Sequence, residues 1–223
     1  MVACSRFSIM EQQLQRAIAV LKEGGVIAYP TDTVYGLGSN ALNEEAVSRI
    51  YQLKQRPLYQ PLPILLADKA DLPKIAVTIS EAAWLLAEHF LPGGLTLIVR
   101  KSSSVPPWIT GGGDTVAVRI PNHPIALALI HGLGKPLIGT SANLSGSLSP
   151  INAQEVRKQL GDKVDFILDG GQCPGGIHST VIDVTGEVPR IIREGAVRVA
   201  EIEKLLRRTG ISRQQSAIGH SSP

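Results

Sequence analysis

Hydroxyl side chains and glycines are concentrated in one short segment, Pro30-Thr31-Asp32-Thr33-Val34-Tyr35-Gly36-Leu37-Gly38. The segment follows residues 26–29, an apolar stretch that is typical of a buried strand. In α/β proteins, the chain that leaves the carboxyl end of a strand commonly contacts ligand. Hydroxyl groups and backbone amides can donate hydrogen bonds to small polar or anionic molecules. The segment therefore predicts one wall of a small-molecule site.

Two cations, Lys54 and Arg56, close the helix that is predicted over residues 44–53. Cations are favoured at a helix C-terminus because they meet the helix dipole and the free carbonyls, so both could be ordinary caps. Alternatively they form a phosphate clamp, in which Lys supplies a point charge and Arg a forked donor. Their position one helix after the hydroxyl-rich segment favours the clamp.

Arg119 lies in an apolar strand predicted over residues 115–120. Alternation places the valines of this strand on one face and Ala117 with Arg119 on the other. An arginine on a covered sheet must find an anion, because a buried unpaired charge is costly. The anion is either an internal Asp or Glu or a bound carboxylate or phosphate, and the sequence leaves both open. His123 is interpreted as a structural histidine rather than a ligand contact.

Three further polar groups follow or end apolar strands. They are Thr140-Ser141-Ala142-Asn143, Ser179-Thr180 and Arg193. Each is either an ordinary turn that satisfies its own backbone or a group that contacts an anionic ligand. The sequence contains no P-loop, dinucleotide fingerprint, nucleophile elbow or His–Cys zinc spacing. A nucleotide would therefore be held by separate basic and hydroxyl residues from distant strands.

Alternating helices and strands must position these residues, and this pattern predicts one α/β domain. Ser8 with Glu11, and Asn152 with Glu155, have the spacing of a capping box at a helix start. The first of these helices is expected to stop at Gly24-Gly25. Other helices are expected over residues 44–53, 80–91, 124–131, 153–160 and 199–208, and strands over 26–29, 62–66, 95–99, 115–120, 137–139, 164–168, 180–184 and 190–193.

Two segments are predicted to lack regular structure. Residues 102–114 are rich in Ser, Pro and Gly and predict a loop long enough to act as a flap. Residues 209–223 are polar, show no apolar period and predict a disordered tail. The folded domain is therefore expected to span residues 1–208.

The composition is that of a compact globular chain with no strong charge bias. The 223 residues are 43% hydrophobic and 18% charged, and the net charge of +3 permits phosphate-bearing ligands or RNA without arguing for either. Aromatic residues make up only 4%, which disfavours base stacking on aromatic platforms. Cys4 and Cys173 match no metal-ligand or redox spacing and suit a reducing compartment. No apolar leader or bilayer-spanning stretch is visible, so we expect a cytoplasmic protein without membrane contact.

Together these segments resemble the YrdC/Sua5 family, the threonylcarbamoyl-AMP synthases. The matching residues are Pro30-Thr31-Asp32-Thr33-Val34-Tyr35-Gly36-Leu37, Lys54-x-Arg56-Pro57, Val116-x-Val118-Arg119-x-Pro121-x-His123, Thr140-Ser141-Ala142-Asn143-x-Ser145-Gly146, Ser179-Thr180-Val181 and Ile192-Arg193-x-Gly195. The matches occur in family order and cover the chain from about Leu14 to Val197.

The resemblance implies both a fold and a reaction. The fold would be a single α/β domain in which a twisted mixed sheet, flanked by helices, forms a large concave and positively charged pocket. The reaction would join L-threonine, bicarbonate and ATP into threonylcarbamoyl-AMP and release pyrophosphate. Partner proteins would then transfer the threonylcarbamoyl group to an adenosine in tRNAs that read codons beginning with A. Positioning and charge neutralisation dominate such chemistry, so no dedicated acid–base triad is expected.

The resemblance also implies residue roles. Thr31, Arg119 and Ser179 would hold threonine, with Arg119 on its carboxylate. The nucleotide and its phosphates would be held by Lys54, Arg56, Ser141, Asn143 and Arg193, with further contacts from Thr115, Ser149 and the backbone around Leu58. Mg²⁺ would bridge the phosphates, and no protein ligand for it can be named.

The chain departs from the family pattern in places. Gln60 stands where many relatives have Lys or Asn, and residues 63–66 lack a histidine that some relatives carry. The extra C-terminal domain of the longer Sua5 proteins is also expected to be absent. Two alternative functions stay open: an RNA-binding module for tRNA or double-stranded RNA, and a carbamoyl-adenylate domain like that of hydrogenase-maturation proteins.

Overall fold

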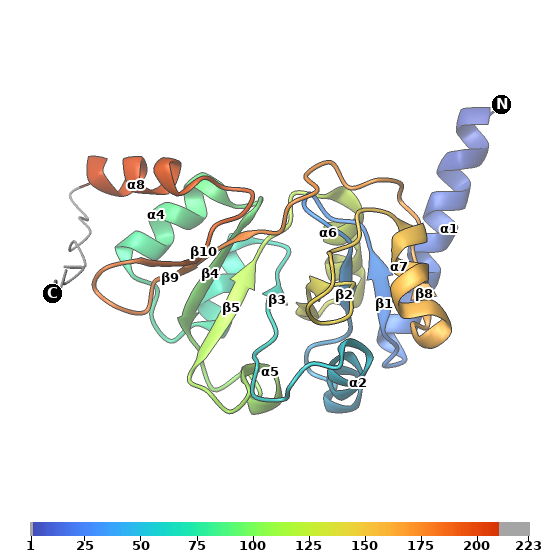
Figure 1. Cartoon of the computed structure of the whole chain (residues 1–223), viewed down its shortest axis with the longest axis horizontal. Helices are drawn as coiled ribbons and strands as arrows, with labels where there is room; N and C mark the ends of the chain where they lie inside the picture. Colours follow the sequence, from blue (N-terminus) through green and yellow to red (C-terminus); the bar gives the residue numbers. More distant parts are fainter. Residues whose placement is uncertain (1, 210–223) are drawn as a thin grey trace, which may run out of the picture.

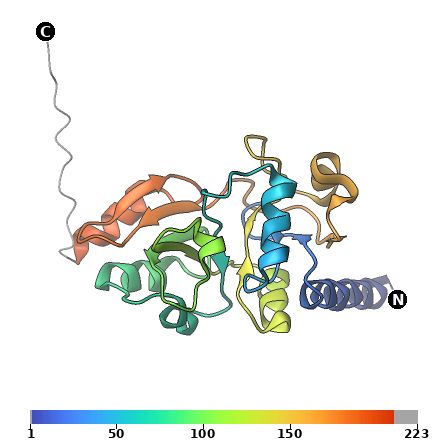
Figure 2. The same cartoon turned by 90° about the horizontal axis from the view of Figure 1, so that it is seen from below.

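The strands are divided between two mixed sheets, whereas the sequence predicted one twisted sheet (Figure 1). The computed structural model describes residues 2–209, with side chains from residue 9 onward. Helices flank both sheets, so the predicted α/β class is confirmed. The two sheets occupy opposite halves of the molecule in Figure 1, and Figure 2 shows α2 near the middle of the molecule.

The four-stranded sheet carries the hydroxyl-rich segment. Its order is β7-β2-β1-β8, in which only the β1–β8 pair is parallel. The strands are β1 (Ile27–Tyr29), β2 (Gly36–Gly38), β7 (Thr140–Ser141) and β8 (Phe166–Ile167). Residues 30–35 therefore form the loop between two antiparallel neighbours.

The six-stranded sheet carries Arg119. Its order is β10-β9-β4-β5-β3-β6, with parallel pairs β4–β9 and β3–β5. The strands are β3 (Ile64–Leu65), β4 (Leu95–Arg100), β5 (Thr115–Arg119), β6 (Leu137–Ile138), β9 (Thr180–Asp183) and β10 (Arg190–Arg193). The predicted strand over residues 62–66 is thus shorter than expected, because Pro63 cannot donate a ladder hydrogen bond.

The chain crosses from one sheet to the other at Gly139. This residue separates β6 of the six-stranded sheet from β7 of the four-stranded sheet. Its amide donates to the carbonyl of Pro63 at 3.0 Å. A Cβ at this position would lie 2.3 Å from Cγ of Leu65, so the close approach requires glycine. The sheets are therefore joined directly, with one residue between consecutive strands.

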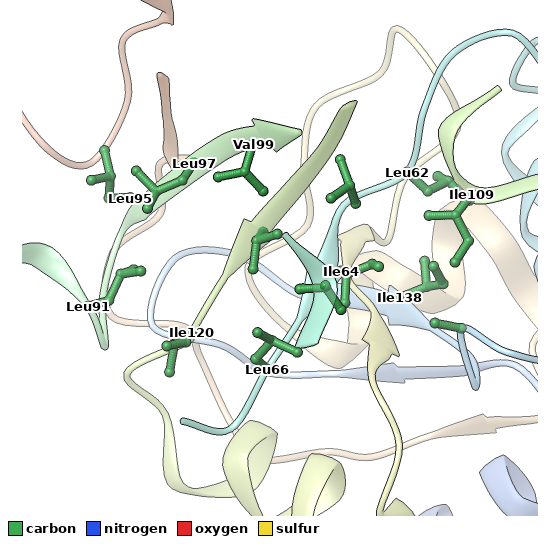
Figure 3. Close-up of a cluster of buried hydrophobic side chains, with 14 of the residues drawn as sticks. Leu62, Ile64, Leu66, Leu91, Leu95, Leu97, Val99, Ile109, Ile120 and Ile138 are labelled. Atoms are coloured by element: carbon green, nitrogen blue, oxygen red, sulfur yellow. The ribbon is translucent and has the colours of Figure 1, made fainter. Parts of the chain in front are cut away.

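Alternation along β4 separates the core from the opposite face of the sheet. Leu95, Leu97 and Val99 are buried in the main hydrophobic cluster, where Figure 3 shows them near β5 and Ile120. The same close-up shows Ile64, Leu62 and Ile138 in this cluster on the side toward the four-stranded sheet. Thr96 and Ile98 alternate with the leucines and face away from this core.

The predicted helices are present with small shifts in their ends. The helices are α1 (Val2–Lys22), α2 (Glu44–Lys54), α3 (Leu72–Ile75), α4 (Glu81–Phe90), α5 (Pro107–Thr110), α6 (Pro124–Leu133), α7 (Ala153–Leu160) and α8 (Val199–Arg208), with short 3₁₀ turns at Lys69–Asp71 and Gly161–Lys163. Side chains of Asn43, Ser80 and Asn152 accept the capping hydrogen bonds at α2, α4 and α7. At α7, the Glu155 carboxylate accepts from the amide of Ile151, the residue before the N-cap, at 2.9 Å, which is a variant of the predicted capping box.

Two predictions about local structure are wrong. Ser8 lies inside α1, which begins at Val2, because no Gly or Pro before Ser8 stops the helix. Residues 102–114 are not a free flap: they contain α5, whose Ile109 is buried and accepts from the amide of Leu62 at 2.8 Å. Apart from Thr209, which ends α8, the predicted tail 209–223 lies outside the described residues. None of the helices within residues 2–209 has both the length and the apolar character that a membrane crossing requires.

Candidate active site

A cavity of about 580 Å³ lies between the two sheets. Its wall includes four cations, Lys54, Arg56, Arg119 and Arg193, and none of its lining residues within the described part of the chain is Asp or Glu. Gly139, at the crossing between the sheets, is also part of the wall. A concave site with one sign of charge concentrates anions, and this volume is in the usual range for a small-molecule site.

The inner face of the six-stranded sheet supplies one side of the cavity. Thr96 and Ile98 of β4 and Ala117 and Arg119 of β5 reach it by the alternation described above. The hydroxyls of Thr96 and Ser179 lie 2.8 Å apart, and both residues are buried. Two hydroxyls that bond each other still keep a free donor or lone pair for a ligand.

Of the two partners that the sequence left open for Arg119, the structure shows the internal carboxylate, and Arg119 also lines the cavity. Its Nη2 donates to Oδ1 of Asp32 at 2.6 Å. Its Nη1 donates to Oγ1 of Thr33 at 2.8 Å, and its Nε donates to the carbonyl of Gly93 at 2.9 Å. Each Nη carries a second hydrogen beyond these contacts, so the guanidinium can also bind a carboxylate.

Thr33, rather than Thr31, lines the cavity. The hydroxyl of Thr31 donates to the carbonyl of Val34 at 2.7 Å and accepts from the amide of Thr33 at 3.1 Å. Thr31 therefore shapes the loop that presents its neighbour. Sequence reasoning also missed Thr96, although a lone hydroxyl in the apolar stretch 95–99 was a signal that could have found it.

Lys54 does not cap its own helix but holds the turn that follows β7. Its buried Nζ donates to the carbonyl of Ser141, and to the carbonyl and Oδ1 of Asn143 at 2.7 and 3.2 Å. Nδ2 of Asn143 donates in turn to the carbonyls of Leu144 and Ser147. Burial, reinforced by the positive charge of Arg56, lowers the pKa of Lys54 to about 7.

This lowered pKa predicts that the free energy of unfolding rises with pH above about 7. In that range the unfolded chain binds a proton at Lys54, whose ordinary pKa is 10.5, while the folded chain has released it. The slope from this one group is at most about 1.4 kcal/mol per pH unit. Urea unfolding of the wild type and of Lys54→Met between about pH 7 and 9 measures it. Equal slopes in the two proteins would contradict the assignment.

Arg56 and Arg193 reach the cavity from different elements, Arg56 from just after α2 and Arg193 from the end of β10. Arg56 donates from Nη2 to the carbonyl of Pro61 at 2.9 Å and from Nε to that of Gln60 at 3.3 Å. Arg193, at the end of β10, donates from Nη2 to the carbonyl of Ser179 at 2.9 Å. The predicted residues that line the cavity are Lys54, Arg56, Arg119, Ser141, Asn143, Ser149, Ser179 and Arg193.

Besides Thr31, two further predicted residues do not line this cavity. Leu58 is exposed and lines a separate cavity of about 390 Å³ with Tyr51, Tyr59 and Trp108. Thr115 shares the face of Ala117 and Arg119 but lies at the opposite end of β5 from Arg119. Within residues 2–209, no cluster of three His, Cys, Asp or Glu side chains could hold a metal ion.

A family model with the description "Telomere recombination", named for Sua5, YciO and YrdC, matches residues 19–195. The chain belongs to the Sua5/YciO/YrdC family. The matched range contains every predicted site residue from Thr31 to Arg193. The family resemblance inferred from six short motifs is therefore confirmed over most of the chain.

Relatives within the Sua5/YciO/YrdC family are similar over nearly the whole chain. Proteins named threonylcarbamoyl-AMP synthase from Pyrococcus abyssi and Bacillus subtilis are 46% and 42% identical over 201 and 200 residues. These alignments cover 90% and 89% of this chain but only 59% and 58% of the relatives, so the chain spans about three fifths of their length. The structure of P. abyssi Sua5 complexed with L-threonine superposes with a TM-score of 0.84 at 47% identity, covering 86% of this chain and 57% of that protein.

Proposed function

We propose that this chain is a threonylcarbamoyl-AMP synthase, a nucleotidyltransferase that condenses L-threonine, bicarbonate and ATP and releases pyrophosphate. The observation that carries the proposal is the Arg119 guanidinium on the wall of a cavity that three further cations line. This charge pattern suits one carboxylate and one triphosphate in the same space. The names of the two relatives and the threonine complex of the Pyrococcus protein support the proposal.

Threonine is proposed to bind against the six-stranded sheet. Its carboxylate would accept hydrogen bonds from the unused Nη hydrogens of Arg119. Ser179, paired with Thr96, would contact the polar groups of the amino acid. Thr31 would act indirectly, because its hydroxyl accepts from the amide of Thr33 and so orders the backbone at that residue.

The nucleotide is proposed to bind across the cavity, on the turn after β7. Ser141, Asn143 and Ser149 offer neutral polar groups, and Arg56 and Arg193 offer forked donors to the phosphates. Lys54 would act chiefly by holding the turn through its Nζ, because a pKa of about 7 leaves it only partly charged near neutral pH. Thr115, at the start of β5, and the backbone around Leu58 lie away from this wall and would contact the nucleotide only after a conformational change. ATP would enter as its Mg²⁺ complex, with the metal on the phosphates.

Such a site would act by positioning. The free amine of threonine attacks the carbon of bicarbonate, a C–N bond forms, and hydroxide leaves as water with an amine proton. An oxygen of the resulting carbamate attacks the α-phosphorus of ATP, and the bond to the β-phosphate oxygen breaks to release pyrophosphate. Arg56 and Arg193 would neutralise the charge that develops on the phosphates, and the two sheets would bring the reacting atoms together.

Pyrophosphate release from ATP tests this proposal directly. We expect release that requires both threonine and bicarbonate, measured with a coupled phosphate assay after removal and restoration of bicarbonate. Release that is indifferent to threonine would overturn the proposal. Tight RNA binding with a steep salt dependence and no turnover would favour the RNA-binding alternative instead.

The product is a mixed anhydride, so a second protein must accept it before water does. We propose that tRNA-modifying threonylcarbamoyl-transfer proteins consume it in the cytoplasm. The cavity itself is sized for the small substrates, so any contact with tRNA would involve the outer surface of the chain.

A further inference from the structure

Asp32 touches the proposed threonine site only through Arg119. It is absent from the cavity wall, and its side chain is 15% exposed. Its Oδ1 accepts from Nη2 of Arg119 at 2.6 Å and from the amide of Asn122 at 3.1 Å. The second contact fixes the carboxylate itself, because the amide of Asn122 belongs to the main chain between β5 and α6 and has no side-chain rotation.

The ion pair spans the two sheets. Asp32 lies in the loop between β1 and β2 of the four-stranded sheet, whereas Arg119 ends β5 of the six-stranded sheet. Thr33 from the same loop holds Nη1, and Gly93 holds Nε. All three guanidinium nitrogens are therefore fixed, and the plane of the fork is set by the β1–β2 loop together with Gly93.

We infer that Asp32 is a positioning residue, which holds the Arg119 guanidinium in the one orientation that presents its unused Nη hydrogens to the substrate carboxylate. The substrate named in this inference rests on the proposed function, whereas the ion pair between Asp32 and Arg119 is present in the structure whatever the substrate is. A carboxylate that merely competed for Arg119 would weaken threonine binding. The two roles therefore predict changes of opposite sign when the charge of Asp32 is removed.

The variant Asp32→Asn separates these roles because the amide keeps the shape and loses the charge-assisted hydrogen bond. We expect the KM for threonine to rise about tenfold or more, because small misplacements of a binding group are costly, and the KM for ATP to change by less than about threefold. A threonine KM that is unchanged or lower would overturn the inference. Asp165→Asn is the matched control, since Asp165 pairs with Arg49 at 2.8 Å and neither residue lines the cavity.

A double-mutant cycle with Arg119→Lys tests whether Asp32 acts through Arg119. A lysine at position 119 cannot bind Asp32, Thr33 and Gly93 together as the guanidinium does. Adding Asp32→Asn to the Arg119→Lys variant should therefore cause little further loss of threonine affinity. Additive losses would contradict the positioning role. If Asp32→Asn fails to fold, Asp32→Glu replaces it in the test. The Glu variant keeps the negative charge but displaces the Arg119 guanidinium, because its side chain is longer. A threonine KM equal to that of the wild type would then count against the inference.

The ¹⁵N resonances of the Arg119 guanidinium give a measurement that does not depend on the reaction. We expect hindered rotation of its Nη groups in the wild type and faster rotation in Asp32→Asn, with no change in Asp165→Asn. Equal rotation in all three proteins would overturn the inference. If rotation is hindered in the wild type and faster in Asp32→Asn, but no threonine-dependent turnover is found, the proposed function fails while the positioning of Arg119 by Asp32 stands.

Discussion

Replacing Arg119 with Ala is expected to raise the KM for threonine about a hundredfold, while the KM for ATP changes by less than about threefold. The guanidinium is the only cation on the inner face of β4 and β5 among the residues that line the cavity. Its loss would leave the threonine carboxylate without a charged partner, whereas Arg56 and Arg193 would still face the phosphates. Initial rates of pyrophosphate release at varied threonine and saturating ATP measure the effect.

Arg119→Lys is the conservative comparison for this prediction. It keeps the charge but not the planar fork, so its threonine KM should lie between those of the wild type and the Ala variant. Equal increases in the KM for threonine and for ATP in Arg119→Ala would contradict the assignment of the carboxylate to this residue.

Replacing Lys54 with Met is expected to lower both stability and turnover. The variant leaves the carbonyls of Ser141 and Asn143 buried without their donor, at a cost of about 3 kcal/mol in total. In a chain of this size, that loss lowers the melting temperature by roughly 10 °C. The affinity for ATP should fall as well, because the turn that carries Ser141 and Asn143 is no longer held. Thermal unfolding and ATP titration of the same preparation measure both effects.

Lys74→Met is the matched control for this second prediction. Lys74 pairs with Asp71 at 2.6 Å on the surface, and its side chain is 76% exposed, so its removal should change stability by less than about 1 kcal/mol. Loss of ATP affinity in Lys54→Met with unchanged melting would mean that Lys54 contacts the phosphates directly.

Local patterns predicted most of the elements and many of the cavity residues. The capping side chain of Asn152 was predicted from the sequence because a cap depends on residues only three positions apart. Alternation in residues 115–120 placed Arg119 on a polar face for the same reason. These features are local, so a single sequence suffices to predict them.

The remaining features depend on contacts between distant segments. The division of the strands between two sheets follows from which strands pair, and strands of two or three residues give no signal of their partners. Thr31 and Thr33 are equivalent in the sequence, and only the loop geometry decides which hydroxyl faces the cavity. The contact between Lys54 and the carbonyl of Ser141 likewise could not be predicted from local patterns, because the two residues are 87 positions apart.

The crossing at Gly139 has a consequence for catalysis. Arg119 and Ser179, which are proposed for threonine, belong to the six-stranded sheet and its adjoining loop, whereas Ser141 and Asn143, which are proposed for the nucleotide, lie in and just after β7 on the other side of the crossing. In the proposed complex, the separation between the carbamate oxygen and the α-phosphorus would therefore depend on how the two sheets are placed relative to each other, and Gly139 is the shortest connection between them. A rotation of a few degrees at such a junction displaces atoms at the far side of the cavity by a fraction of an ångström, the scale on which reactivity between two bound molecules depends.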